Sequence, residues 1–300
     1  MQEFTKILQN IELIQEAQKR KDPVLNVVTL FSGMGAPEIA LDKLGVKYRI
    51  VLASDIDPEA EAVYKQLHGK KLAKGNDSFI PNVYDVLDQV EPSKLSADVL
   101  IAGFSCNPFS SSGKQYGIYS RQVKPEGSNK KFVVNIKRHL TDINGDTAIT
   151  INNDESDPLP EGLPEGTKVT ISPDSDGKLA FQTLKIAQTL KPKVIILENV
   201  STFGQADIED EDEVPSEFIT EEKEIKVIQS RLGQSGKVDI SEGGYLRLLG
   251  KIFNTIGYSF YPMYLDPTSY TNSVIRRPRI YIVGIRNDIE AGINPNKLGF

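Results

Sequence analysis

The fold is decided by the stretch Asp98-Val99-Leu100-Ile101-Ala102-Gly103-Phe104-Ser105-Cys106-Asn107-Pro108-Phe109-Ser110. Its four apolar residues from Val99 to Ala102 predict a short, buried parallel strand. The strand stops at Gly103, and the only cysteine of the chain, Cys106, follows almost at once. Open α/β sheets bind ligands beyond the carboxyl ends of their strands, which is where this cysteine would lie. A lone cysteine is more often an inert apolar residue, so the rest of the chain must decide between the two interpretations.

Composition narrows the class of protein. A chain of 300 residues, 39% hydrophobic and 25% charged, predicts a globular protein with one large domain, or one domain plus an appendage. The single cysteine excludes an internal disulfide and fits a reducing cytosol, and only two histidines argue against a histidine-based metal site. No apolar run is long enough to cross a membrane. The net charge of -6 means that nucleic-acid binding would need a local basic patch or basic surface from another chain.

The N-terminal third alternates helices and strands. Apolar residues at helical spacing predict an amphipathic helix over residues 2–20. A strand at 24–31, a glycine turn at 32–36 and a helix at 37–44 then form the first half of a nucleotide-binding unit. The third glycine of the dinucleotide motif is absent, so an ordinary tight turn remains an equal alternative for residues 32–36.

Acidic residues follow the next strands. After a strand at 48–54, Asp57 precedes Pro58 and suits the N-cap of a helix over 59–67, which leaves Asp55 free for a ribose. Helix capping alone is the alternative for this acidic pair. A third strand, ending at Asp85, is predicted more weakly.

Residues 115–175 interrupt the alternation. They predict a β-rich insertion with strands near 131–136, 148–151 and 168–171, and Asn144-Gly145 is a hairpin-turn signal. The acidic spacing at 142–146 suggests a calcium loop, but Thr147 stands where that loop needs glycine, so we reject this interpretation.

The alternation then resumes up to residue 285. We expect helices at 179–190 and 245–256, a strand at 194–197 ending in Glu198, a solvated acidic loop at 207–224, and an antiparallel hairpin of strands 258–265 and 279–285. The basic cluster Arg276-Arg277-Pro278-Arg279 lies between the hairpin strands, which would hold its arginines on a scaffold.

Read together, residues 24–118 and 176–287 resemble the C5-cytosine-specific DNA methyltransferases. The motifs that carry the resemblance are Phe31-Ser32-Gly33-Met34-Gly35, Gly103-Phe104-Ser105-Cys106-Asn107-Pro108-Phe109-Ser110, Asp176-Gly177-Lys178-Leu179, Glu198-Asn199-Val200 and Arg277-Pro278-Arg279-Ile280-Tyr281-Ile282-Val283-Gly284. The resemblance implies an α/β fold with a Rossmann-like, mostly parallel methyltransferase sheet and an antiparallel edge hairpin. The expected domains are an N-terminal helix at 1–23, a catalytic domain at 24–114 and 176–300, and the β-rich insertion at 115–175.

The resemblance also implies the chemistry. Cys106 as a thiolate would attack C6 of a flipped-out cytosine, and Glu198 would contact N3 and the exocyclic amine. Arg279 and Arg277 would brace the base O2 and the cysteine loop. C5 would then take a methyl group from S-adenosylmethionine, leaving S-adenosylhomocysteine, and no metal is implied.

The resemblance assigns a cofactor site as well. Phe31, Ile56 and Leu179 would pack on the adenine, Gly33 and Gly35 would hold the methionine moiety, Asp55 would bind the ribose and Asp85 the adenine amine. Ser32, Met34 and Phe104 complete the expected cofactor-binding set.

Some positions depart from the family pattern. Ser105 replaces the proline that usually precedes the nucleophile, Thr29 stands where an acid is common, and Ile275 replaces a glutamine. The resemblance leads us to expect a target-recognition domain and a final Gly-Asn motif after Arg277 and Arg279, and these 300 residues contain neither. Three explanations stay open: a catalytic subunit whose partner subunit brings target recognition, a fragment, or a chain in which helix 2–20 and the insertion substitute for the missing parts. The acidic net charge favours the first.

Three functions therefore compete. The first is a DNA cytosine-C5 methyltransferase of the restriction-modification type, acting on DNA that contains the target cytosine, in the cytoplasm of a bacterial or phage-infected cell. The second is a tRNA cytosine-C5 methyltransferase, and the third is a catalytically silent subunit that binds only cofactor or DNA. The presence of Cys106, Glu198 and both arginines argues against the third, because binding alone does not need all four.

Overall fold

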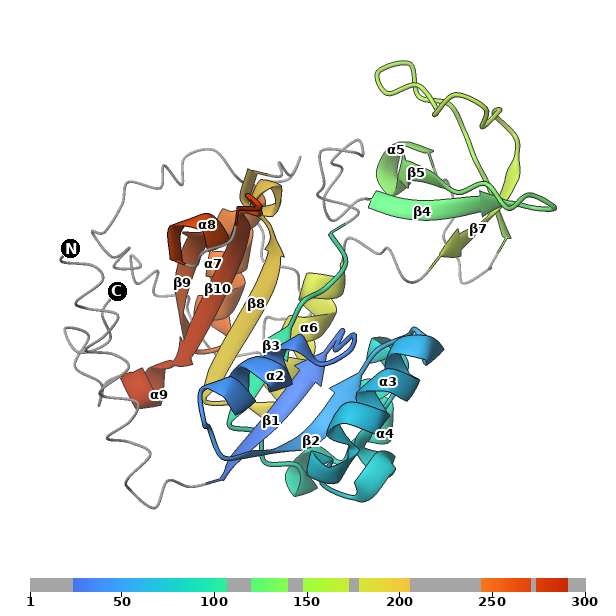
Figure 1. Cartoon of the computed structure of the whole chain (residues 1–300). Helices are drawn as coiled ribbons and strands as arrows, with labels where there is room; N and C mark the ends of the chain where they lie inside the picture. Colours follow the sequence, from blue (N-terminus) through green and yellow to red (C-terminus); the bar gives the residue numbers. More distant parts are fainter. Residues whose placement is uncertain are drawn as a thin grey trace.

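A computed structural model describes residues 24–106, 120–139, 148–172, 178–205, 244–270 and 274–290. Six strands form a central sheet in the order β2-β1-β3-β8-β10-β9 (Figure 1). These strands are β1 Leu25–Leu30, β2 Tyr48–Ser54, β3 Val99–Ala102, β8 Val194–Val200, β9 Tyr258–Leu265 and β10 Arg279–Arg286. The first four in the spatial order are parallel, and β10 is antiparallel to both of its neighbours. The predicted α/β class, with a mostly parallel sheet and an antiparallel edge hairpin, is confirmed.

Helices cover the two faces of this sheet unequally. Helices α2 Ala36–Lys43 and α3 Pro58–His68 lie on one face, beside β1 and β2. Helices α6 Leu179–Leu190 and α7 Gly244–Thr255 belong to the large core that contains the inward residues of β3, β8 and β10. Asp57 caps α3 by accepting from the backbone N–H of Glu59 at 2.8 Å, as its position before Pro58 predicts.

The predicted strand that ends at Asp85 is wrong. Residues Val83–Asp85 form a 3₁₀ turn, η3, which runs into the short helix α4 Val86–Gln89. The Asn82 side chain accepts from the backbone N–H of Tyr84 at 3.1 Å and starts the turn. A local side-chain cap therefore outweighs the β propensity of the valines. The remaining short elements are η1 Gly69–Lys71, η2 Gly75–Ser78, η4 Pro92–Lys94, η8 Ser201–Gln205, α8 Pro267–Tyr270 and α9 Asn287–Glu290.

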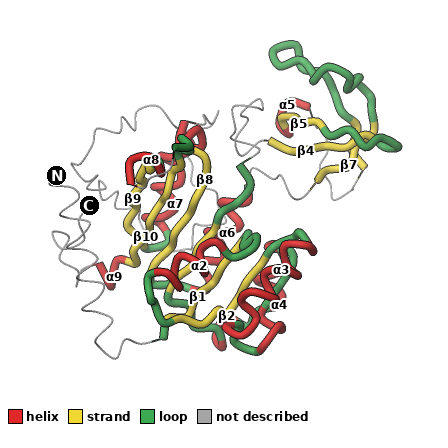
Figure 2. The backbone as a smooth tube through the Cα atoms, in the orientation of Figure 1, coloured by secondary structure: helices red, strands yellow, loops and turns green. Residues whose placement is uncertain are grey.

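The insertion forms a second, wholly antiparallel sheet in the order β5-β4-β7-β6. Its strands are β4 Ser120–Pro125, β5 Phe132–Asn135, β6 Ala148–Thr150 and β7 Lys168–Ser172, and α5 Ile136–His139 follows β5. Figure 2 shows these strands gathered apart from the central sheet. They enclose a small core of their own, made of Val123, Phe132, Val134, Ile151, Leu163 and Val169. The helix predicted at 2–20, the Asn144-Gly145 turn and the acidic stretch at 207–224 lie outside the described residues.

Gly284 of β10 is a sensitive point of the core. A Cβ there would lie 2.3 Å from Cε1 of Phe253, a fully buried ring that packs edge-on against Phe260. We expect Gly284→Ala to lower the free energy of unfolding by about 1–3 kcal/mol, because the ring and its neighbours must move. Urea denaturation measures this change. The control is Gly250→Ala in α7, whose Cβ would meet Phe260 at 3.4 Å and which gains helix propensity. Equal destabilisation by both variants would contradict the packing argument.

Candidate active site and cofactor pocket

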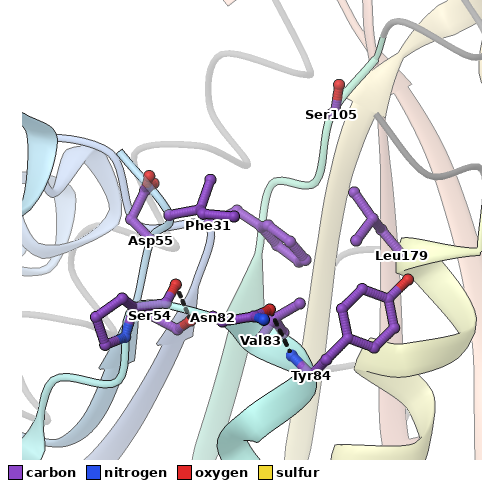
Figure 3. Close-up of a pocket in the computed structure, with 10 residues that line it drawn as sticks. Phe31, Ser54, Asp55, Asn82, Val83, Tyr84, Ser105 and Leu179 are labelled. Carbon is purple, nitrogen blue, oxygen red and sulfur yellow. Dashed lines mark hydrogen bonds between the residues drawn. The ribbon is translucent and has the colours of Figure 1, made fainter. Parts of the chain in front are cut away.

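Two pockets open at the carboxyl ends of the parallel strands. The first, which Figure 3 shows in close-up, receives residues from the ends of β1 and β2, from the turn before η3 and from the start of α6. It is lined by Phe31, Ser54, Asp55, Ile56, Pro81, Asn82, Val83, Tyr84, Ser105 and Leu179. The second is lined by Gly103, Phe104, Ser105, Cys106, Glu198, Asn199, Val200, Arg277 and Arg279. Both lie where the sequence predicts ligand binding.

Asp55 connects the glycine turn to the end of β2. Its Oδ2 accepts from the backbone N–H of Gly33 at 2.7 Å, and its Oδ1 accepts from the backbone N–H of Asp57 at 3.0 Å. Asp57 is the helix cap, as predicted, and both carboxylate oxygens of Asp55 accept backbone hydrogen bonds. Asp55 also lines the first pocket, and a carboxylate oxygen that accepts one hydrogen bond can accept another.

The glycines of the turn have different roles. Phe31, Gly33 and Gly35 all adopt positive φ, at 55°, 52° and 86°. A Cβ at Gly35 would lie 2.2 Å from Nε2 of His68, so this glycine is needed for the packing of α3 against the turn. At Gly33 there is open space for a Cβ, and only the positive φ favours glycine.

Only some of the predicted cofactor residues line a pocket. Phe31, Asp55, Ile56 and Leu179 line the first pocket. Phe104 is buried, packs edge-on against Phe31 with ring centroids 6.3 Å apart, and lines the second pocket instead. The predicted residues that line neither pocket are Ser32, which is buried, Gly33, Met34, which is 64% exposed, Gly35 and Asp85.

Asn82 is a polar pocket residue that the sequence analysis missed. Asp85 is half-buried at the end of η3, whereas Asn82 and Tyr84 reach the pocket wall (Figure 3). One feature of the sequence points to Asn82, because Pro81-Asn82 is a turn signal that follows two apolar residues. In the structure the second of these, Ile80, lies beside β2 and donates its backbone N–H to the carbonyl oxygen of Ala53. Ser54, Pro81 and Val83 are the other pocket residues that were not predicted.

A buried hydrogen-bond network joins the elements on either side of the glycine turn at 32–36. Glu38, the only buried residue of α2, accepts from the hydroxyl of Thr29 on β1 and from that of Tyr64 on α3, the latter at 2.6 Å. Burial, and secondarily the Glu38 carboxyl, raises the pKa of Tyr64 above its usual range. One carboxyl group thus joins β1, α2 and α3.

In the second pocket, the four predicted catalytic residues come together from three parts of the chain. Cys106 follows β3 and is half-buried, Glu198 lies within β8, and Arg277 and Arg279 precede and begin β10. The Nε of Arg279 lies 3.0 Å from Oε1 of Glu198. Glu198 is paired in register with Tyr281, whose pKa is raised by burial and then by the nearby Glu198 charge.

The loop that carries the cysteine is held by Asn199. Its Nδ2 donates to the carbonyl oxygen of Phe104 at 3.1 Å, and its Oδ1 accepts from the N–H of Val200 at 2.8 Å. Gly103 lies beside the neighbouring carboxyl, and a Cβ there would be in ordinary van der Waals contact with Oε2 of Glu198, at 3.5 Å. The nucleophile loop and the carboxylate strand therefore have a fixed relation to each other.

Ser105 lines both pockets. A ligand in the first pocket and a ligand in the second would therefore meet at the wall that this residue forms. Within the described part of the chain, no cluster of three or more histidine, cysteine, aspartate or glutamate residues could hold a metal ion. The same residues include no helix with the length and apolar character needed to span a bilayer.

Comparisons with known proteins agree with the geometry. Residues 25–124 match the family model for the C-5 cytosine-specific DNA methylase. The chain is similar to the orphan methyltransferase M.SPBetaI of Bacillus phage SPbeta, at 26% identity over 88% of this chain and 46% of the phage protein. It is also similar to the type II methyltransferase M.HhaI of Haemophilus parahaemolyticus, at 23% identity over 88% of this chain and 50% of that protein.

Among solved structures, Dnmt2 methyltransferase of S. pombe aligns with 88% of this chain and 50% of its own, at 16% identity and a TM-score of 0.44. The chain spans about half the length of the curated relatives it matches.

Proposed function

The resemblance of this chain to the C5-cytosine-specific DNA methyltransferases is confirmed, and on that premise we propose that it is the catalytic part of such an enzyme. The observation that carries the proposal is the second pocket. It holds a cysteine, a carboxylate and two guanidinium groups, and it shares a wall with a pocket suited to a nucleoside. Neither a silent binding subunit nor a structural role would require that combination of side chains.

Cys106 is the proposed nucleophile. Cytosine C5 is a poor nucleophile until a group adds to C6, so the Cys106 thiolate forms a bond to C6 and the ring electrons move toward C5 and N3. C5 then takes the methyl group, a base removes the C5 proton, and the C6–S bond breaks to restore the aromatic ring. The target base must leave the duplex for this reaction, because C6 is not accessible in a stacked pair.

Glu198 and Arg279 would bind the polar edge of the cytosine. Glu198 is proposed to contact N3 and the exocyclic amine, and Arg279 with Arg277 to contact O2 and the cysteine loop. The 3.0 Å pair between Arg279 and Glu198 aligns the carboxyl group in the pocket before any base enters. A bound base would share this carboxyl group with the guanidinium, which orients the ring over Cys106.

The first pocket fits the nucleoside half of S-adenosylmethionine. Phe31, Ile56 and Leu179 offer apolar surface for a purine, and Asp55 offers carboxylate oxygens for the ribose hydroxyls. Asn82 takes the place proposed for Asp85 as the polar contact to the purine edge, because it lines the pocket. When bound, the cofactor would supply an electrophilic methyl group, and the wall that the two pockets share at Ser105 supports a donor next to the cytosine.

Asp55→Asn tests the first pocket. An amide cannot accept from both Gly33 and Asp57 through two oxygens, so one backbone N–H loses its partner and the glycine turn shifts. We expect the dissociation constant for S-adenosylmethionine, measured by calorimetry, to rise roughly ten- to a hundred-fold. Asp57→Asn is the matched control, because asparagine caps a helix as well as aspartate does and binding should be unchanged. Equal affinity in both variants would remove Asp55 from the cofactor site.

Target recognition would come from outside these residues. The chain spans about half of its relatives and carries a net charge of -6, so we propose that a partner subunit or further polypeptide supplies phosphate contacts and sequence specificity. A tRNA substrate is the second candidate, which the pocket chemistry alone admits because the base is the same.

Transfer of tritium-labelled methyl groups separates the candidates. The chain is incubated with labelled S-adenosylmethionine and either DNA or tRNA, with and without the product of a neighbouring reading frame. Label in DNA, increased by the second polypeptide, is the expected result. Label in tRNA alone supports the second candidate, and no label in either nucleic acid under any condition contradicts methyl transfer.

A further inference from the structure

The sheet of the β-rich insertion has one apolar side. Its core contains Val123 of β4, Phe132 of β5 and Val169 of β7, together with Ile151 and Leu163. The three strand residues are buried, and the register of the strands makes them neighbours. Because side chains alternate along a strand, the residues between these buried positions lie on the opposite side of the sheet.

Lysines gather on that opposite side. Lys124 of β4 is half-buried and is paired with Thr170 of β7, which is exposed. Lys168, also exposed, then occupies the diagonal position across from Lys124. The exposed Lys131 directly precedes β5, and the register of β4 with β5, continued by one residue, sets it opposite Lys124. We call these four residues, with Gln122 of β4, the lysine face.

The spacing of the lysine face suits a polyanion. Two strand separations and two residue rises put the Cα atoms of Lys131 and Lys168 about 12 Å apart. Over that length, each strand of DNA carries about three phosphates. Within the described residues no salt bridge engages Lys124 or Lys168, so their ammonium groups can contact a ligand. Lysines opposite one another also repel, a cost that a bound polyanion removes.

The charges of the insertion are separated along its sequence. Residues 120–139 contain Glu126 as their only acid, against six lysines and arginines. Residues 152–167 contain five acids and no lysine or arginine, and they pack on the apolar core through Leu163, on the other side of the sheet from the lysine face. The insertion therefore carries the local basic surface that a chain with a net charge of -6 needs if it is to bind nucleic acid.

The insertion is joined closely to the candidate site. Ser172 ends β7, and Leu179, seven residues later, lines the first pocket. Seven residues span at most about 25 Å, the length of roughly seven base pairs of duplex. In Figure 1 the insertion lies on the side of the central sheet toward which β3 and β8 run, the side on which both pockets open. A duplex with a base in the second pocket can therefore reach the insertion.

We propose that the lysine face binds the phosphate backbone of duplex DNA beside the extruded cytosine. This inference rests on the proposed function and adds to the phosphate contacts expected from a partner polypeptide. Ammonium, amide and hydroxyl groups contact phosphate oxygens without reading the sequence, so target recognition still comes from elsewhere. The described residues of this face include no aromatic side chain on which unstacked bases could stack, which favours a duplex over single-stranded DNA or RNA.

Lys124→Gln with Lys168→Gln tests the surface in the full chain. Loss of two phosphate contacts should raise the Kd for a labelled duplex of about 30 base pairs roughly ten-fold at about 50 mM salt, and lower the slope of log Kd against log salt concentration by about two. Fluorescence anisotropy measures both quantities. The matched control is Lys43→Gln with Lys47→Gln, which neutralises two exposed lysines between α2 and the amino end of β2, and should bind as the wild type does. Unchanged melting temperatures show that both variants are folded.

The outcomes separate this proposal from the proposed function. Equal changes in both double variants, or no binding of duplex by the wild-type chain at that salt concentration, would overturn the lysine face and leave methyl transfer untouched. Loss of affinity for tRNA without loss for duplex DNA would assign the face to RNA and also overturn the proposal. A chain that binds duplex through these lysines but transfers no label contradicts only the proposed function.

Chemical labelling of the unsubstituted chain gives an independent measurement. Amine acetylation, with and without duplex DNA, is mapped by mass spectrometry. We expect the duplex to reduce the labelling of Lys124, Lys131 and Lys168 several-fold and to leave that of Lys43 and Lys47 unchanged. Equal protection of all five lysines, or no protection of the lysine face, would contradict the proposal.

Discussion

Cys106→Ser is expected to lower methyl transfer at least about a thousand-fold and to abolish the covalent adduct with DNA that contains 5-fluorocytosine. A serine hydroxyl remains protonated at neutral pH and is a far weaker nucleophile than a thiolate, so addition to C6 does not begin. Fluorine at C5 cannot leave as a proton would, and it therefore traps the wild-type adduct after methylation. Denaturing gel electrophoresis detects the adduct as a shift of the labelled DNA.

The control for this variant is cofactor binding. Cys106 does not line the first pocket, so the dissociation constant for S-adenosylmethionine should be unchanged. An adduct that persists in Cys106→Ser, with the partner polypeptide present, would show that another residue is the nucleophile. Absence of an adduct in the wild-type chain under the same conditions would contradict the proposed covalent mechanism.

Glu198→Gln is the second variant with a large expected effect. The amide keeps the size of the side chain but loses the negative charge that pairs with Arg279 and would stabilise the protonated edge of the cytosine. We expect kcat for methyl transfer to fall roughly a hundred- to a thousand-fold, with a smaller change in KM, because the interaction is strongest in the transition state. Steady-state transfer of tritiated methyl groups measures both constants.

Glu91→Gln is a matched control for the charge change. Glu91 lies before η4, pairs with Lys94 and lines neither pocket. It should leave kcat and KM unchanged. A loss of kcat that is similar in both variants would mean that net charge, and not the Glu198–Arg279 pair, is responsible.

Most elements of the central sheet could be predicted because their signals are local. The strands at 48–54 and 258–265 and the helix at 179–190 have the predicted bounds, since apolar periodicity and flanking turns define each of them. The strand β4, which was not predicted, shows the opposite case. Its sequence Ser-Arg-Gln-Val-Lys-Pro has one strong apolar residue, and pairing with β5 and β7 on both sides makes it a strand.

The sequence predicted the catalytic residues of the second pocket, but only part of the lining of the first pocket and little of the bonding in either. Sequence order and strand ends placed Cys106, Glu198 and the arginines together. The bond from Gly33 to Asp55 joins segments 22 residues apart, which sequence pattern does not reveal. Asn82 instead of Asp85 reaches the first pocket because a local cap turns residues 83–85 into a 3₁₀ turn. The sequence pattern predicts the edge of the sheet at which a residue lies. The groups that form hydrogen bonds with that residue are known only from the folded structure.

The position of Ser105 on the wall between the two pockets has a thermodynamic consequence. Filling either pocket would change the surroundings of one shared residue, so we expect the binding of the two ligands to be coupled. By linkage, whatever factor the methyl donor imposes on the affinity for the extruded base must be returned unchanged by the base to the donor. Ser105, at a position where the resembled family usually has proline, lies at the wall through which such a coupling would pass.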